Sequence, residues 1–148
     1  MIALLQRVNK ARVEVAGDLV GAIDSGLLVF LAIEKKDTQA IADKLLSRVL
    51  GYRVFADDAG KMNLSVSDCN AGLLIVSQFT LAAETHKGTR PGFSPAADPE
   101  TGETLYTYFT EQAGKLHSTV ASGQFGADMQ VTLTNDGPVT FWLQVNSP

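Results

Sequence analysis

The first third of the chain is a series of apolar runs separated by short polar breaks. Four runs, MIALLQRV, ARVEV, LVGAI and GLLVFLAI, are divided by Asn-Lys, Gly-Asp and Asp-Ser-Gly. Alternation with a period of two is typical of half-buried strands, and an uninterrupted apolar run is typical of a strand covered on both faces. The pattern therefore predicts four strands within residues 1–33.

The apolar period changes from two to that of a helix in TQAIADKLLSRVL, residues 38–50. Its apolar positions fall on one stripe: Ile41, Leu45, Leu46, Val49 and Leu50. Thr38 or Asp37 precedes the stripe and is suited to cap a helix N-terminus. We expect a helix here, with the stripe facing the core.

Further along, YRVF and the apolar run GLLIV indicate strands, with DDAGK as a turn. Residues 84–102 contain three prolines and three glycines and form the longest segment expected to be irregular, so we expect this segment to be functional or mobile. ETLYTYFTEQAGKL has a helical apolar face. MQVTLT and VTFWLQV alternate as strands.

The segment between these last two strands is unusual. Asn135-Asp136-Gly137 is typical of a tight hairpin turn, because these residues tolerate positive φ. Pro138 follows at once, although proline lacks an N–H and is poorly suited to begin a return strand. The pattern predicts a hairpin turn, and the proline needs a separate explanation.

Taken together, these elements predict an α/β or α+β fold. We expect a single compact domain over residues 1–148, with a mixed, mostly antiparallel sheet or barrel-like core of seven or eight strands and two main helices.

The net charge of the chain limits the classes of partner that it can bind. A net charge of −4 and a pI near 5.0 argue against binding along DNA or another long nucleic acid, but they allow contact with one end of an RNA. MIALLQRVNK does not resemble a signal peptide, and no apolar stretch is long enough for a membrane helix. We expect a cytoplasmic protein with no membrane partner.

Metal and cofactor motifs are missing from the sequence. Cys69 is the only cysteine, and His86 and His117 are 31 positions apart, so both histidines are interpreted as surface residues. No glycine-rich phosphate loop is present. We predict no metal and no cofactor.

Polar groups follow the buried run GLLIV directly, at Ser77, Gln78 and Thr80. The ends of parallel strands often border a cleft, so these groups are candidates for a site, although they also suit a structural cap of the strand. No GxSxG motif or histidine context supports a catalytic triad. Lys87 and Arg90 add a basic spot on the long loop, either as solvated charges or at a phosphate.

Four motifs, in this order and spacing, resemble the D-aminoacyl-tRNA deacylases of bacteria and eukaryotes. They are SQFTL at 77–81, KGTRPGFSPAA at 87–97, FGADMQV at 125–131 and NDGPVT at 135–140. The resemblance extends from Met1 to about Val145, with glycine at position 92 where the family pattern has serine.

The resemblance implies an enzyme that hydrolyses the ester between a D-amino acid and the 3'-terminal adenosine of tRNA, and that also clears mischarged glycine. It implies a homodimer with active sites at the subunit interface. Ser77, Gln78, Phe79 and Thr80 would form the catalytic stretch. Phe125 and Met129 would flank the adenosine, and a cis Gly137-Pro138 pair would enter the partner's site.

The backbone of this Gly-Pro pair would form a rigid wall in the partner's site. The wall would reject L-amino acids by steric exclusion and would still admit glycine, which has no side chain. We favour attack by water, with backbone N–H groups around Phe79 and Thr80 holding the oxyanion and the ribose 2'-hydroxyl assisting. Thr80 as a covalent nucleophile is the rival mechanism. Arg7 either braces the Gly-Pro turn or is an ordinary surface arginine. The competing functions are a non-catalytic tRNA-end binding module and a generic Ser/Thr esterase.

Overall fold

The structure is a computed structural model that describes residues 1–148. It contains eight strands, three α-helices and one 3-10 helix. In chain order these are β1 Ile2–Val15, β2 Asp18–Ile23, β3 Gly26–Ala32, α1 Gln39–Gly51, β4 Phe55–Ala56, β5 Met62–Leu64, α2 Val66–Cys69, β6 Gly72–Ser77, η1 Phe79–Ala82, α3 Pro99–Leu116, β7 Val120–Ser122 and β8 Gln130–Gln144.

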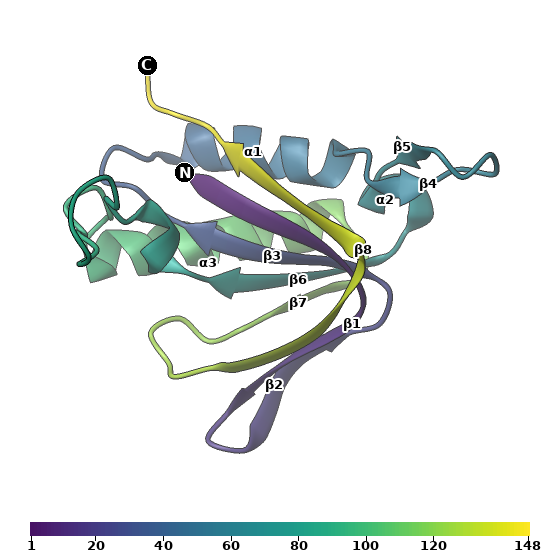
Figure 1. Cartoon of the computed structure of the whole chain (residues 1–148), viewed down its shortest axis with the longest axis horizontal. Helices are drawn as coiled ribbons and strands as arrows, with labels where there is room; N and C mark the ends of the chain where they lie inside the picture. The colour runs from purple at the N-terminus through teal and green to yellow at the C-terminus, as the bar shows by residue number, and fades with distance from the viewer.

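Six strands form one mixed sheet in the order β2-β1-β3-β6-β7, with β8 paired to the other edge of β1 (Figure 1). Pairs involving β1 are antiparallel, whereas β3 with β6 and β6 with β7 are parallel. The sheet curls until β2 approaches β7. A Cβ atom on Gly21 would lie 2.5 Å from the carbonyl oxygen of Ser122, so glycine is required where the ends nearly close. The predicted mixed, barrel-like single domain is confirmed.

The first two predicted strands are one strand, β1. Asn9 and Lys10, which we interpreted as a break, are exposed residues within it. The strand continues because its first half pairs with β3 and its second half with β2, while β8 accompanies both. Two polar residues in sequence therefore mark a change of pairing partner.

The predicted hairpin turn at residues 135–138 is also wrong. β8 runs through this segment as one strand, and residues 136–139 form a bulge between the pairs Val8 with Asn135 and Gln6 with Thr140. The Asn135 side-chain amide fills the bulge by donating to the carbonyls of Arg7 (3.1 Å) and Val139 (3.0 Å). The chain continues instead of reversing because β1 offers pairing partners on both sides of the bulge.

Two helices cover one face of the sheet and lie together behind the strands in Figure 1. Helix α1 confirms the expected helix, with the Thr38 side chain accepting from the N–H of Ile41. Helix α3 begins at Pro99, with Asp98 as its N-cap, so the irregular segment is shorter than expected. The main core cluster of 24 buried residues includes residues of both helices and of the sheet. A second, smaller cluster around Val8 and Leu28 includes residues of β1, β2, β3 and β6.

Two other predictions fail locally. Of YRVF only Phe55 is in a strand, the two-residue β4, which pairs with β5 across the predicted turn. His117 was expected at the surface but is only 7% exposed. It follows the last residue of α3, where the chain turns toward β7, and its Nε2 atom lies against the carbonyl of Ala71. His86 is exposed, as expected.

Candidate functional site

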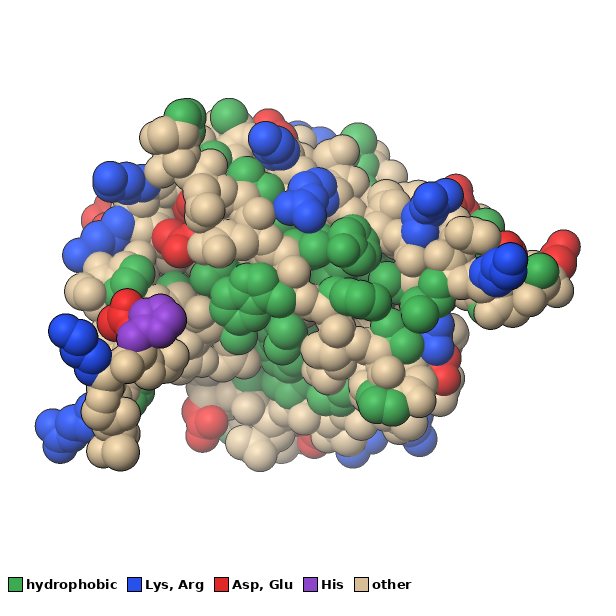
Figure 2. All heavy atoms as spheres, turned by 45° about the horizontal axis from the view of Figure 1, so that its top comes forward, with side chains coloured by type: hydrophobic (Ala, Val, Ile, Leu, Met, Phe, Trp, Pro, Cys, Tyr) green, Lys and Arg blue, Asp and Glu red, His purple; other side chains and the backbone are tan.

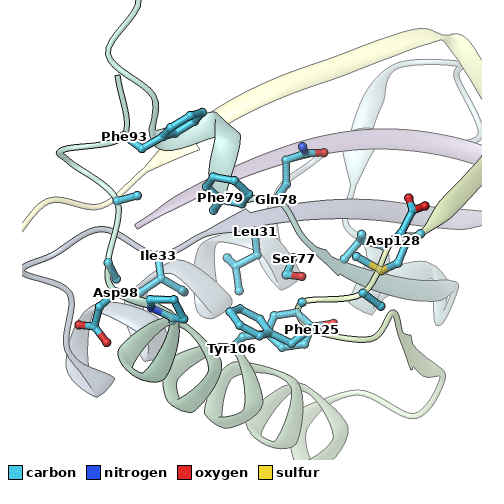
Figure 3. A pocket seen from close by; sticks show the side chains of 18 of the residues that line it. Leu31, Ile33, Ser77, Gln78, Phe79, Phe93, Asp98, Tyr106, Phe125 and Asp128 are labelled. Atoms are coloured by element: carbon cyan, nitrogen blue, oxygen red, sulfur yellow. The ribbon is translucent and has the colours of Figure 1, made fainter. Parts of the chain in front are cut away.

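A cavity of about 610 Å³ opens where the parallel strands β3 and β6 end. Leu31 and Ser77 pair at this edge of the sheet, and both line the cavity. The opposite wall comes from α3 and from the loop between β7 and β8 (Figure 3). Most of the lining is apolar, with few polar groups, as is typical of small-molecule sites.

Five of the sequence-predicted residues meet in this cavity. Ser77, Gln78 and Phe79 line it from the end of β6 and the start of η1, and Phe125 and Met129 line it from the loop between β7 and β8. Nearly fifty residues separate the two groups in sequence. They meet because α3 carries the chain back across the sheet between them.

Thr80 lies beside the cavity and does not line it. The Gln78 side-chain amide donates to the Thr80 hydroxyl. Phe79 and Thr80 also begin the 3-10 helix η1, so their N–H groups have no acceptor within that helix. Two unpaired backbone donors therefore stand next to the polar end of β6, where they are suited to hold an oxyanion.

Two aromatic rings stand at the opening of the cavity. Phe79 is 58% exposed and Phe93 is 41% exposed, and their ring centroids are 5.1 Å apart. Sequence reasoning did not name Phe93 as a site residue, although it lies inside the KGTRPGFSPAA motif. Exposed aromatic rings of this kind offer stacking surfaces to a ligand.

Tyr106, also missed, supports the inner wall. Its hydroxyl donates to the carbonyl of Ile75 (2.8 Å), and its ring lies 5.8 Å from that of Phe125. Burial raises the pKa of Tyr106 to about 12, so this hydroxyl stays protonated and acts as a donor rather than a base. The sequence placed Tyr106 within the predicted helix ETLYTYFTEQAGKL, and nothing further in the sequence marked it.

The Met129 side chain is held in place by the backbone of residues 123 and 124. Its sulfur accepts from the N–H of Gln124 (3.4 Å) and occupies the space beside Gly123, where a Cβ atom would lie 2.7 Å from it. Glycine at position 123 therefore allows the thioether to fold against the backbone.

The charged groups of the cavity are all acidic. Asp98 and Asp128 line it, and no lysine, arginine or histidine does. Hydrogen bonds from the backbone N–H and the hydroxyl of Thr101 lower the pKa of Asp98, so this carboxylate is ionised at neutral pH. No group of three or more metal-ligating side chains is found.

Gly137 and Pro138 do not reach this cavity. They are exposed on the β8 bulge and their peptide bond is cis. Gly137 lies beside Arg7, which pairs with Leu27 at the start of β3, so the bulge is at the end of the sheet opposite to Ser77. Arg7 binds this bulge: its Nε donates to the Asp136 carbonyl (3.3 Å) and its Nη1 donates to the Val54 carbonyl (2.7 Å). The bracing role weighed for Arg7 is thus the arrangement found.

The fold and cavity define an α/β domain with a ligand pocket at the carboxyl ends of its parallel strands. The sequence profile described as D-Tyr-tRNA(Tyr) deacylase matches residues 4–144. A protein named D-aminoacyl-tRNA deacylase from Pseudomonas fluorescens is 65% identical over 97% of this chain and 99% of its own length. One of the same name from Janthinobacterium sp. is 61% identical over 98% and 97%. The chain belongs to the D-Tyr-tRNA(Tyr) deacylase family.

Two solved structures share the fold. One, titled c-Myc DNA Unwinding Element Binding Protein, has a TM-score of 0.95 and is 41% identical, covering 99% of this chain and 100% of its own. The other, a probable eukaryotic D-amino acid tRNA deacylase, has a TM-score of 0.88 at 18% identity, covering 97% and 98%. No helix of this chain has the length and apolar character needed to cross a membrane.

Proposed function

We propose that this protein hydrolyses the ester bond of D-aminoacyl-tRNA, and of mischarged glycyl-tRNA, as a single deacylase domain in the cytoplasm. The observation that carries the proposal is the pair of unpaired N–H groups of Phe79 and Thr80 beside a cavity in a member of the deacylase family. The products are the free amino acid and tRNA.

The terminal adenosine enters the cavity between the two walls. Phe125 and Met129 flank the base, and their positions are held by Tyr106 and Gln124 as described. Ser77 and Gln78 face it from the end of β6. An apolar cavity with few polar groups suits a neutral nucleoside better than a charged one.

Water attacks the ester carbonyl, and the N–H groups of Phe79 and Thr80 hold the resulting oxyanion. The vicinal 2'-hydroxyl of the ribose assists the water. A covalent role for Thr80 is less favourable, because its hydroxyl is bound by the Gln78 amide and the cavity lining includes no histidine to act as its base.

Chiral selection comes from a second copy of the chain. Gly137 and Pro138 are exposed and lie away from the cavity of their own chain, so only a partner's cavity can use them. The outer edge of β8 pairs with no other strand, and Trp142 on it is 51% exposed, which supports a homodimer formed along this edge. The backbone wall blocks an L-side chain and leaves glycine untouched.

One assay tests this function. D-tyrosyl-tRNA, L-tyrosyl-tRNA and glycyl-tRNA are incubated separately with the purified protein, and the released amino acid is measured. We expect hydrolysis of the D-tyrosyl and glycyl substrates, with the L-tyrosyl substrate slower by at least about a hundredfold, because a steric clash of roughly 3 kcal/mol has that effect.

The same assay separates the competing functions. Release from none of the substrates would identify a non-catalytic tRNA-end binding module. Equal release from both enantiomers, together with cleavage of simple esters, would identify a generic Ser/Thr esterase.

A further inference from the structure

A basic hairpin stands at the opening of the cavity. Residues 84–92, here called the mouth hairpin, are closed by two backbone hydrogen bonds between Glu84 and Gly92, of 2.7 and 3.0 Å. Gly88 at its tip has a φ of +66°, a conformation that glycine adopts without strain. Residues 84–91 are all exposed, so the mouth hairpin contributes little to the core.

Both ends of the mouth hairpin are anchored at the cavity. It begins just after η1, which starts at Phe79, and it is followed directly by Phe93. These two aromatic residues contact each other and line the cavity opening (Figure 3). Arg90 is three residues from Phe93 and Lys87 is six residues from it, and an extended chain spans at most about 3.5 Å per residue, so the two cations stay within about 10 Å and about 20 Å of the cavity opening.

Two cations on the mouth hairpin have no ion-pair partner. Lys87 and Arg90 take part in none of the ion pairs of the structure. The only carboxylate of the mouth hairpin, Glu84, accepts from the N–H of His86 at 2.7 Å. Figure 2 shows basic side chains beside a histidine at a protruding corner of the molecule. In a chain of net charge −4, these two cations are left free for a ligand.

The cavity itself is unsuited to phosphate. Its charged residues, Asp98 and Asp128, are both acidic, and the pKa of Asp98 is lowered by its hydrogen bonds. A nucleoside at the end of an RNA strand can enter, but its 5'-phosphate and the phosphates before it must remain outside. The charged residues of the cavity are thus acidic, whereas the free charges at its opening are basic.

We propose that Lys87 and Arg90 of the mouth hairpin bind the phosphates that join the terminal nucleoside to the rest of the RNA strand. This inference rests on the proposed function and adds a second contact region to it. Arg90 is suited to bidentate contact with one phosphate and Lys87 to a point-charge contact with a neighbouring one. Two contacts to single-stranded RNA correspond to a slope of log affinity against log salt of about −1.4.

The test compares two double variants with the wild-type protein. K87A/R90A removes the cations of the mouth hairpin. K44A/K115A removes the same charge from exposed positions on α1 and α3 and serves as the matched control. Each protein is assayed on D-tyrosyl-tRNA and on D-tyrosyl-adenosine, which has no phosphate, over a range of salt concentrations.

For K87A/R90A we expect KM for D-tyrosyl-tRNA to rise about tenfold at ~0.2 M salt, with a salt slope shallower by about 1.4 and kcat within about twofold. The rate at which K87A/R90A hydrolyses D-tyrosyl-adenosine should equal that of the wild type. The control K44A/K115A should match the wild type in KM and kcat on both substrates. The charge-retaining variant K87R/R90K stays within about threefold of the wild type.

Three outcomes would overturn the inference: an unchanged KM for tRNA in K87A/R90A, an equal loss on both substrates, or a K87R/R90K variant as defective as K87A/R90A. If the wild-type protein hydrolyses no aminoacyl-tRNA, the proposed function fails by itself. The mouth hairpin is then tested by measuring the dissociation constant and its salt slope for an RNA oligonucleotide that ends in CCA and carries no amino acid. Circular dichroism of each variant confirms that it folds.

Discussion

At the residue level, the contacts of Thr80 bear on which group attacks the ester. Figure 3 shows Ser77 facing the cavity centre, with Asp98 and Asp128 on opposite sides of it. The Thr80 hydroxyl is bound by the Gln78 amide and stands outside the lining. A nucleophile needs a base within hydrogen-bond reach, and these positions offer none to Thr80. Attack by water is the mechanism that the arrangement favours.

The variant Thr80→Ala distinguishes the two mechanisms. It removes the hydroxyl but keeps the backbone N–H, so we expect kcat for D-tyrosyl-tRNA to fall by less than about tenfold, the loss of one modest hydrogen bond. A substrate whose terminal ribose lacks the 2'-hydroxyl should lose more than that with the wild-type protein. Single-turnover rates measure both effects. Abolition of activity in Thr80→Ala would identify a covalent nucleophile.

At the scale of elements, the sequence predicted those whose period is long and regular. Both main helices and the buried strands β3 and β6 were predicted because their apolar stripes or runs leave one reasonable packing. The joined strands β1 and β8 were missed because their polar breaks resemble turns. Only pairing partners distant in sequence, absent from any local pattern, show that the strand continues.

The site divides in the same way. Ser77 and Gln78 were predictable from an apolar run that ends abruptly in polar residues. Phe125 and Met129 came only from the family resemblance, because a lone aromatic residue and a lone methionine carry no local signal. Tyr106 was missed because a buried tyrosine on a helix face is indistinguishable from core until its hydroxyl is seen to meet Ile75.

The contact between α3 and β6 through Tyr106 has a pH signature. The pKa of Tyr106 is raised to about 12 in the folded protein and returns to about 10 on unfolding. Between these values the folded state holds more protons, so the free energy of unfolding falls as pH rises from 10 to 12. Tyr106→Phe removes this dependence and also costs about 1 kcal/mol at neutral pH, through the lost hydrogen bond.

Urea unfolding at pH 7, 9.5 and 11 measures this effect. The difference in stability between the wild-type protein and Tyr106→Phe should shrink at the highest pH, since charging then penalises only the wild type. A difference that is constant with pH would show that the Tyr106 hydroxyl is as free to ionise in the folded state as in the unfolded state.

At the scale of the whole molecule, the proposed site is divided between the two ends of the sheet. The cavity lies where β3 and β6 end, and the Gly137-Pro138 bulge lies beside Arg7, near the start of β3. Because the two parts lie apart within one chain, we propose that two chains pack antiparallel, so that each bulge meets the other chain's cavity. The edge of β8 that pairs with no strand supports this arrangement.

Trp142→Glu tests the assembly because it places a charge on the exposed edge of β8, where a partner would cover it. We expect the wild type to sediment at about twice 15.8 kDa and the variant at 15.8 kDa. Deacylation of D-tyrosyl-tRNA should fall at least about tenfold in the variant, and its preference over L-tyrosyl-tRNA should fall with it, since the partner's wall is lost. Leu116→Glu changes an exposed apolar residue at the end of α3 (65% exposed, against 51% for Trp142) and should leave both mass and selectivity unchanged. A monomeric variant that still rejects L-tyrosyl-tRNA would place the basis of chirality within a single chain.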